Sequence, residues 1–294
     1  MSEVIWFGNK CVKISQYLLH MSKNITFAPL KRFNSIIVLI VLFLSLSGCD
    51  KFNKLLKSTD SELKLAKAKE YYDKEVYLKS SQLYEDLIPY VKGTPKAEEV
   101  YYYYSWSEYY LGDYLLSQYH FKNFTRQFPN SVHSEECYFM NAYCYYLTSA
   151  NYKLDQTSTK NAIKEFQSFI DTYPESTRLD SCNKLIDKLQ QKIEKKEYEV
   201  VKLYYKIEDY KAAIVASQNF VKDYPSSEFN DELMFITVNS YYLLAINSIQ
   251  SKKAERLDGA IENYLKMFDL YPKSSSLSRA EKIYNNCKTL KEKL

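Results

Sequence analysis

A short segment made of an aromatic residue, proline, one variable residue and serine occurs four times in this chain. Each copy follows a stretch with apolar side chains at i, i+3, i+4 and i+7, which is typical of an amphipathic helix. Proline ends a helix, and the Ser or Asn that follows can cap the next one. The intervals between the four copies are 45, 51 and 47 residues, and the prolines are Pro129, Pro174, Pro225 and Pro272. Such a period predicts a repeat protein built from short helices.

The composition agrees with helices. The 294 residues include only five Gly and seven Pro, while 46% are hydrophobic and 26% are charged. So few turn formers cannot supply the many tight turns of a β-sandwich, barrel or propeller. Glycine loops that hold phosphate are missing too, and the disordered, collagen-like and disulfide-knot classes do not fit. The sequence therefore predicts an all-α protein.

Residues 98–131 contain the clearest unit of the repeat. Glu98 to Tyr110 is expected to be one helix, Leu111-Gly-Asp-Tyr114 a tight turn, and Tyr114 to Gln127 a second helix. Position by position the unit resembles the tetratricopeptide repeat, although Ser117 stands where that family usually has Ala. Ser105 is small, and two helices can cross closely only where a side chain is short. The remaining residues that carry the resemblance are Tyr101, Tyr104, Phe121, Phe124 and Pro129.

A shift of 37 residues places Ala68 and Ala142 at the position of Ser105, which predicts units before and after this one. We expect a tetratricopeptide-like α-solenoid of about five helix-turn-helix repeats and a C-terminal capping helix. The alternative is an unrelated helical bundle with coincidental boundaries. Units one to three are expected in 61–176, and the third has an insertion at Thr148–Thr159. The second half, 177–294, is expected to contain most of a single long helix over Ser176–Tyr205 and a fourth unit that ends at Pro225. A fifth unit pairs Asp231–Ala245 with Gly259–Tyr271 around a polar insertion, Asn247–Leu257, and a capping helix covers Ser275–Leu294.

The amino terminus has the layout of a secretory signal. Residues 36–46 form an apolar run that is half as long as a membrane-spanning helix needs, and Lys31 and Arg32 precede it. The run ends in Leu46-Ser-Gly-Cys49, which resembles a bacterial lipobox. We expect residues 1–48 to be removed, Cys49 to carry acyl and diacylglycerol lipid, and 49–60 to be a linker. An ordinary signal peptide with a chance Cys is the alternative; Met21 is a second possible start, and Asp50 leaves the choice of membrane open.

The net charge depends on that removal. Residues 1–48 hold five of the forty basic side chains and one of the thirty-six acidic ones, so the mature chain has thirty-five of each. A neutral chain with interspersed signs has no electrostatic surface for nucleic acid. Attachment to a membrane is expected through the lipid.

The four cysteines of the mature chain are expected to be small buried hydrophobes. Cys137 and Cys144 are two helical turns apart and cannot form a disulfide with each other. A disulfide with Cys182 or Cys287 is conceivable in an oxidising compartment.

The sequence shows little that could carry catalysis. His120 and His133 lie on different predicted elements, without a Cys or carboxylate at the spacing of metal ligands. The motifs of serine hydrolases, zinc proteases and phosphate loops are missing. Carboxylate pairs at 98–99 and 135–136 open predicted helices, where the helix dipole favours them. We predict a protein that is not an enzyme and has neither a metal nor a dissociable cofactor.

The chain contains thirty tyrosines, including four in succession from Tyr101 to Tyr104. Four successive residues point to all sides of a helix, so they cannot all be core. In the tetratricopeptide family, set positions of the first helix face a concave groove, and aromatic side chains suit the binding of an extended or unfolded peptide there. The alternative is that Tyr replaces Phe and Leu in the core. The resemblance assigns to the groove Leu65, Lys69, Tyr72, Glu99, Tyr102, Trp106, Tyr109, Tyr110, Phe139, Tyr143 and Tyr146.

A lipobox followed by about five such units resembles the BamD family of lipoproteins, and the segment Lys195–Tyr205 with Tyr210 and Tyr224-Pro225 resembles its fourth unit. That resemblance implies a lipid-anchored scaffold in the outer membrane, facing the periplasm, within the machinery that assembles β-barrel proteins. The first three units would then bind unfolded outer membrane proteins, and the last two would dock the barrel-forming subunit. The alternatives are another tetratricopeptide lipoprotein that scaffolds envelope or division proteins, or a helical lipoprotein that binds glycans.

Overall fold

The computed structural model describes residues 51–294, and these residues contain helices and turns but no strand. The signal segment, Cys49 and Asp50 lie outside the described residues. Residues 51–56 are helical and belong to a first unit that ends at Thr59, while Asp60–Leu294 form a second compact unit. The helices of the second unit are α3 (Ser61–Asp73), α4 (Tyr77–Val91), α5 (Ala97–Leu111), α6 (Tyr114–Gln127), α7 (Ser134–Leu147), α8 (Thr157–Thr172), α9 (Leu179–Lys206), α10 (Tyr210–Asp223), α11 (Asn230–Ile246), α12 (Gln250–Leu270) and α13 (Leu277–Lys291).

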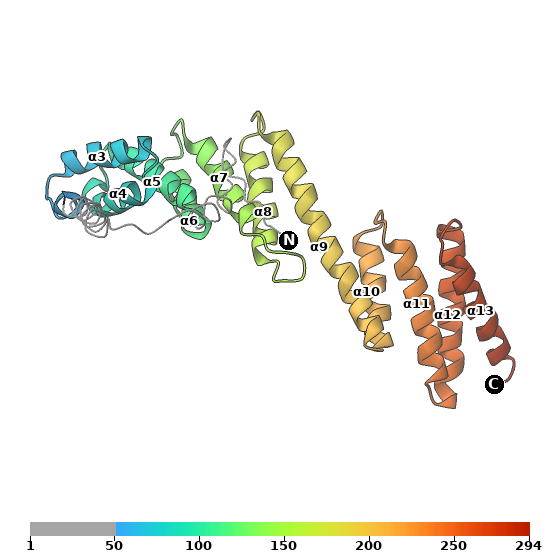
Figure 1. The fold of residues 1–294 in the computed structure, drawn as a ribbon. Helices are drawn as coiled ribbons and strands as arrows, with labels where there is room; N and C mark the ends of the chain where they lie inside the picture. Colours follow the sequence, from blue (N-terminus) through green and yellow to red (C-terminus); the bar gives the residue numbers. More distant parts are fainter. Residues whose placement is uncertain (1–50) are drawn as a thin grey trace, which may run out of the picture. The chain divides into compact units, whose positions relative to one another are not determined.

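Consecutive helices of the second unit pack side by side as hairpins (Figure 1). Each helix contacts the next one along the chain, and α3 also contacts α5, α9 contacts α11, and α11 contacts α13. Contacts of this kind, between neighbours in sequence, define a solenoid. The chain is therefore an all-α solenoid of helix-turn-helix repeats, as predicted.

The aromatic-proline segments form the boundary between one hairpin and the next. At each one the aromatic residue ends a helix, and its backbone N–H donates to the carbonyl four residues back, at 2.8 Å for Phe128 and Tyr224. The serine two residues after the proline then closes a turn, because its N–H donates to the carbonyl of that aromatic residue, at 3.0 Å for Ser131 and 3.1 Å for Ser227.

The serine does not cap the next helix, contrary to the sequence-based expectation. The hydroxyl of Ser131 accepts from the N–H of His133 at 3.0 Å, and the N-cap of α7 is His133 itself, which makes no side-chain capping bond. The hydroxyl therefore stabilises the turn before the helix, and the helix begins three residues after the serine.

A second kind of turn joins the two helices of a hairpin. Gly112 lies in the left-handed region with φ 83°, and the Asp113 carboxylate caps α6 by accepting from the N–H of Leu116 at 3.0 Å. Asp209 caps α10 in the same way, at 3.1 Å from the N–H of Ala212. The left-handed residue before it is Glu208, with φ 64°. The same turn geometry is therefore built here without glycine.

The helices of a hairpin cross where side chains are small. Ser105 and Ser117 are fully buried, and the Ser117 hydroxyl donates to the Ser105 carbonyl at 3.0 Å. Ser80 makes the equivalent bond to the Ala68 carbonyl at 3.0 Å. Ser117 in place of Ala thus keeps the close crossing and satisfies its own hydroxyl.

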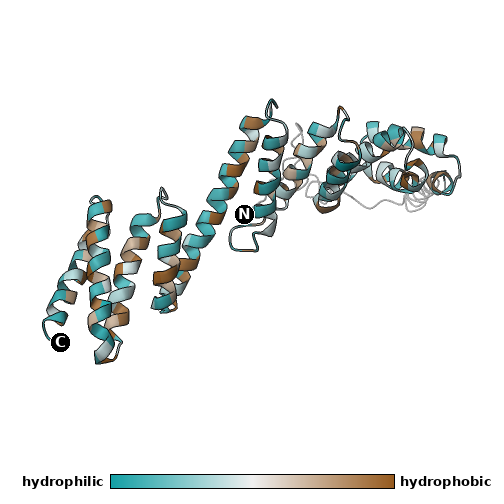
Figure 2. Ribbon diagram, turned by 180° about the vertical axis from the view of Figure 1, so that it is seen from behind, coloured by the Kyte–Doolittle hydropathy of each residue, from teal (hydrophilic) through white to brown (hydrophobic). Residues whose placement is uncertain are grey.

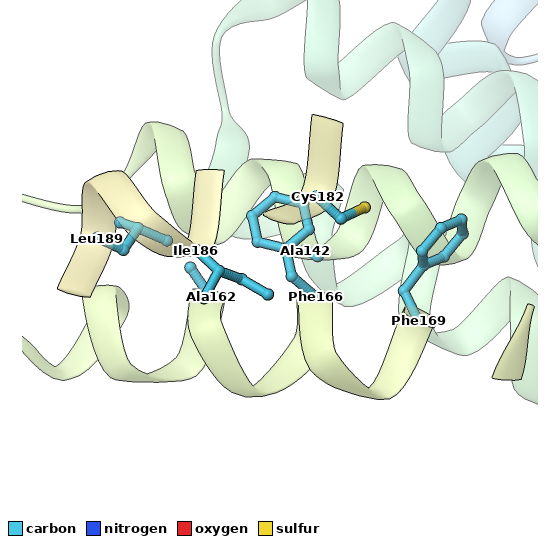
Figure 3. Packing of buried hydrophobic residues seen from close by; sticks show 7 residues of the cluster. All are labelled: Ala142, Ala162, Phe166, Phe169, Cys182, Ile186 and Leu189. Carbon is cyan, nitrogen blue, oxygen red and sulfur yellow. The ribbon is translucent and has the colours of Figure 1, made fainter. Parts of the chain in front are cut away.

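Figure 2 shows apolar and polar residues interspersed along the helices, and the apolar residues that are buried form the core. The core consists of successive clusters, each shared by neighbouring helices. Figure 3 shows the cluster that joins α7, α8 and α9, which contains Ala142, Ala162, Phe166, Phe169, Cys182, Ile186 and Leu189.

All four cysteines of the second unit are free and buried, as expected of small hydrophobes. Burial raises the pKa of the Cys144 thiol to about 12 and that of the Cys182 and Cys287 thiols to about 11. Such thiols remain protonated and unreactive at neutral pH.

The helix α9 runs without a break through 179–206 and serves two hairpins. Its first half supplies Ile186 and Leu189 to the cluster with α8, and its second half supplies Tyr198 and Val201 to a cluster that includes Phe220 of α10.

The segment 148–156 between α7 and α8 is held against α9. Lys192 donates to the Ser149 hydroxyl at 2.7 Å, and Lys196 donates to the Leu154 carbonyl at 2.6 Å. The Gln156 amide closes the loop from inside by donating to the Asn151 carbonyl at 2.9 Å. This insertion is therefore an ordered part of the solenoid.

The expected start of the last hairpin's second helix was wrong. Gly259 was predicted to begin it, but α12 begins at Gln250 and most of the polar segment 247–257 is its first turns. The segment is helical because Leu257 is buried with Ala245 and Cys287, and Lys252 pairs with Glu255 one turn later.

The helix α13 closes the solenoid: Ala280 and Cys287 are buried against the preceding pair, while its outward residues are mostly polar and exposed. A polar outer face is what a terminal capping helix needs.

Candidate functional site

The residues predicted to face a groove lie on the first helices of the first three hairpins. Most are half-buried, whereas Glu99 is exposed and Tyr110 keeps 48% of its surface exposed. The aromatic members form one surface, here called the N-terminal aromatic row: Tyr72 on α3; Tyr102, Trp106, Tyr109 and Tyr110 on α5; Phe139, Tyr143 and Tyr146 on α7.

The rings on α3 and α5 contact one another. Trp106 stacks on Tyr110 at 5.5 Å between ring centroids, and its edge meets Tyr109 at 5.4 Å. Tyr72 reaches Tyr110 from the neighbouring helix at 6.2 Å, and Tyr102 meets Trp106 at 6.3 Å. Aromatic pairs at these distances stabilise each other, so this part of the row is a preformed apolar surface.

The rings on α7 continue the row. Phe139 stacks on Tyr143 at 5.8 Å, and Tyr143 stacks on Tyr146 at 5.7 Å. Trp106, Phe139 and Tyr143 pack on one cluster around Phe121, which fixes their positions relative to each other. The Tyr102 hydroxyl also donates to the Glu136 carboxylate of α7 at 2.7 Å.

Two tyrosines of this surface were missed by the sequence reasoning. Tyr77 stacks on Tyr110 at 4.5 Å, and Tyr103 lies 4.8 Å from Tyr72. The ammonium of Lys69 lies 4.9 Å from the centroid of Tyr103, which is cation–π distance. The signal for Tyr103 was present in the run of four tyrosines, but the family positions selected only its neighbour Tyr102.

Lys69 of the predicted groove has a partner of its own. Lys69 pairs with Asp73 at 2.5 Å, and this hydrogen bond raises the pKa of the Lys69 ammonium. Burial raises the pKa of the hydroxyls of Tyr72 and Tyr102, and it raises that of Tyr109 to about 12. At neutral pH these hydroxyl groups are therefore neutral; that of Tyr102 donates to Glu136, and the other tyrosines of the row can donate to a ligand.

The same register continues in the second half of the solenoid. The shift from Pro129 to Pro225 places Tyr198 at the position of Tyr102, and Phe235 at the position of Phe139. The contacts repeat as well. Tyr102 stacks on His133 at 4.1 Å, and Tyr198 stacks on Phe229 at 4.2 Å.

The hydrogen bonds to the next first helix also repeat. Tyr198 donates to Glu232 at 2.5 Å, as Tyr102 does to Glu136. A cation lies 3.9 Å from each of these carboxylates, Arg178 beside Glu136 and Lys202 beside Glu232. The sequence reasoning assigned groove residues only to the first three units, although the same shift would have located these.

A family model described as an outer membrane lipoprotein family, YfiO, matches residues 58–257 of this chain. The chain belongs to the YfiO family. The match covers four of the hairpins, all of α11 and the start of α12. No curated protein matches this YfiO member. Among solved structures it is similar to the TPR2AB domain of yeast Sti1 in a complex with an Hsp90 peptide, with 11% identity, a TM-score of 0.37, and coverage of 78% of this chain and 98% of that one.

Two further observations concern the described part of this YfiO protein. Residues 51–294 contain no group of three or more His, Cys, Asp or Glu side chains that could hold a metal ion. Within the same residues, no helix is both long and apolar enough to cross a membrane.

Proposed function

We propose that this YfiO-family protein is a lipid-anchored scaffold of the outer membrane, facing the periplasm, within the machinery that assembles β-barrel proteins. Membership of an outer membrane lipoprotein family supports the location. The anchor in this proposal is acyl and diacylglycerol lipid on Cys49, and more than one acyl chain is needed for stable attachment. The protein acts by binding other proteins and not by catalysis.

The N-terminal aromatic row is the observation that carries the binding part of the proposal. A peptide laid along α3, α5 and α7 meets stacked rings such as Trp106 and Tyr110, which contribute large apolar contact at small entropic cost. The hydroxyl groups of the row can donate to carbonyl groups of a peptide that has no secondary structure of its own. In the proposal the ligands are unfolded outer membrane proteins, and the last two hairpins dock the barrel-forming subunit.

The test is peptide binding by a variant of the row. Replacing Tyr102, Trp106 and Tyr143 with Ala is expected to weaken binding of an unfolded barrel-protein peptide by about tenfold or more, or about 1.4 kcal/mol. Because these rings also pack on the core, Tyr110→Ala gives a second variant, at a side chain that keeps 48% of its surface exposed; circular dichroism checks the fold of both. Tyr119→Ala is the matched control, since Tyr119 is 60% exposed and lies on α6, outside the row. Unchanged affinity in both row variants would exclude the row as the binding surface.

Partners are tested by purification of the intact lipoprotein in mild detergent. The proposal expects the barrel-forming subunit among the proteins that copurify. Copurification of envelope or division proteins without that subunit would instead identify a different scaffold.

A further inference from the structure

A hollow on the second half of the solenoid is distinct from the N-terminal aromatic row. It has a volume of about 950 Å³ and is lined by α9, α11, the start of α13 and Lys153 of the 148–156 insertion. By the repeat shift from Pro129 to Pro225, Tyr205 of the hollow occupies the position that Tyr109 has in the N-terminal aromatic row. The hollow therefore lies on the same face of its repeat as the row does. The volume is that of a site for a short peptide segment and not for a single ion.

The floor of the hollow is apolar and open to solvent. Leu203, which lines the hollow together with Phe235 and Ile236, keeps 54% of its surface exposed. An exposed leucine next to an aromatic ring contributes binding energy when an apolar side chain covers it.

The acidic side chains of the lining already have partners. Glu199 pairs with Lys195 at 3.1 Å. Glu232 accepts from Tyr198 at 2.5 Å and lies 3.9 Å from Lys202. Asp231 accepts from the backbone N–H of Glu232 at 2.7 Å. The lining therefore holds four cations, Lys153, Lys202, Lys206 and Arg279, against these three carboxylates, and two of the carboxylates lie beside a lysine.

Three cations of the lining have no carboxylate partner among the described residues. These are Lys153, Lys206 and Arg279. The Arg279 guanidinium is held in place, because it lies 4.2 Å from the centroid of Phe235 and donates to the Ser276 hydroxyl at 2.7 Å. Its stacking on Phe235 leaves other N–H groups of the fork free to bind a carboxylate.

We propose that this hollow docks an acidic segment of a protein partner, in which an apolar side chain covers Leu203 and flanking carboxylates pair with Arg279, Lys206 and Lys153. The complementarity of charge and the apolar floor together favour this occupant. The inference rests on the proposed scaffold role only in assigning the segment to a protein, and it names a surface separate from the aromatic row.

The experiment measures fluorescence anisotropy with the full-length protein in mild detergent. The probe is a labelled peptide of about nine residues with blocked ends that alternates Asp or Glu with Leu or Phe. The comparison peptide has Lys at the acidic positions. We expect the acidic peptide to bind, the lysine peptide to bind at least tenfold more weakly, and the affinity to fall as salt is raised.

Charge reversal locates the site. Lys206→Glu combined with Arg279→Glu is expected to weaken the acidic peptide at least tenfold, and Leu203→Ser alone about threefold. Lys211→Glu with Lys222→Glu is the matched control, because both lysines are exposed on α10 away from the hollow, and it is expected to change affinity less than twofold. All of the replaced side chains are exposed, so folding, checked by circular dichroism, is expected to be intact.

Several results would overturn the proposal. They are equal affinity for the two peptides, no binding of the acidic peptide, or no loss on reversal of Lys206 and Arg279. Binding of phosphatidylglycerol vesicles that depends on these residues, without peptide binding, would identify a lipid surface instead. Failure of the row variants described above leaves these measurements unaffected, so the two proposals fail separately.

Discussion

The hydroxyl of Tyr198 on α9 donates a 2.5 Å hydrogen bond to the Glu232 carboxylate on α11, thirty-four residues later. Tyr102 on α5 makes the same contact with Glu136 on α7. Both bonds join the first helix of one hairpin to the first helix of the next, across the boundary set by an aromatic-proline segment. The boundary is therefore stabilised by a polar contact as well as by the apolar clusters.

Tyr198→Phe is expected to lower the free energy of unfolding by about 1 kcal/mol, because it removes the hydrogen bond to Glu232 and the one that Lys202 donates to the hydroxyl at 3.1 Å, while both charged groups can still be solvated. Urea unfolding followed by circular dichroism measures the change. Tyr119→Phe, in which the lost hydroxyl is exposed, is expected to have almost no effect. A loss as small as that of the control would show that the bond contributes nothing to stability.

Glu208→Gly is expected to raise the free energy of unfolding by about 0.5–1 kcal/mol. Glu208 has φ 64°, a conformation that costs a residue with a Cβ atom more than it costs glycine. Gly112→Ala at the equivalent turn is the reciprocal test. Its added Cβ would meet nothing within 4 Å, so a loss of about 1 kcal/mol there reports the backbone alone. A loss of stability in Glu208→Gly, or a gain in Gly112→Ala, would contradict the assignment of backbone strain to these turns.

Gly259→Ala is expected to destabilise the protein by about 1–3 kcal/mol, although alanine favours helices by about 1 kcal/mol. A Cβ atom at 259 would lie 2.6 Å from ring atoms of Tyr241 on the packed helix α11. Thermal unfolding measures the effect. In a Tyr241→Leu background, the same substitution is expected to become neutral or stabilising, and persistence of the full loss there would show that another contact is responsible.

His120 predicts how stability depends on pH. Burial lowers the pKa of its imidazole from 6.5 to about 4, and neither ring nitrogen has a hydrogen-bond partner among the described residues. Below pH 6.5 the unfolded chain therefore takes up a proton that the folded chain does not, so stability falls as pH is lowered from 6.5 towards 4. The expected loss over this range is about 2 kcal/mol.

Measuring urea unfolding at several pH values for the wild type and for His120→Gln isolates this contribution. Glu108 also changes the pH dependence of stability, because burial raises the pKa of its carboxyl. Its contribution to the free energy of unfolding is lost as pH rises. Both proteins contain Glu108, so subtracting their free energies of unfolding at each pH cancels its contribution. Parallel pH profiles would show that His120 does not titrate as proposed.

Cys49→Ser is expected to give a folded protein that no longer fractionates with membranes, because each buried methylene of an acyl chain contributes roughly 0.8 kcal/mol to membrane binding. Cell fractionation with and without carbonate washing is the measurement. If the variant still sediments with the outer membrane, protein partners and not lipid hold it there.

Where residue types fix a boundary by themselves, the sequence was sufficient. The helix α6 begins and ends where predicted, because Asp113 caps it and Phe128-Pro129 stops it. The start of α12 was missed since Ile249 makes no side-chain cap, and the helix is extended to Gln250 by burial of Leu257, which only the fold reveals.

In the candidate site, too, the sequence located some residues, whereas others could be found only from the fold. The register of the repeat located Tyr102 and Trp106, because a fixed spacing puts them on one face of their helix. The contacts of Tyr77 and the partnering of Lys202 depend on which side chains of neighbouring hairpins meet. The free cations of the C-terminal hollow could be identified only after the ion pairs were known.

The unbroken α9 belongs to two hairpins at once, with Leu189 in one core and Val201 in the next. A displacement of the last hairpins is therefore passed through one continuous helix, and not through a flexible loop, to the hairpins that lie nearer the amino terminus. Inserting a flexible glycine linker within α9 would uncouple the two cores, while each core would keep its own part of the helix.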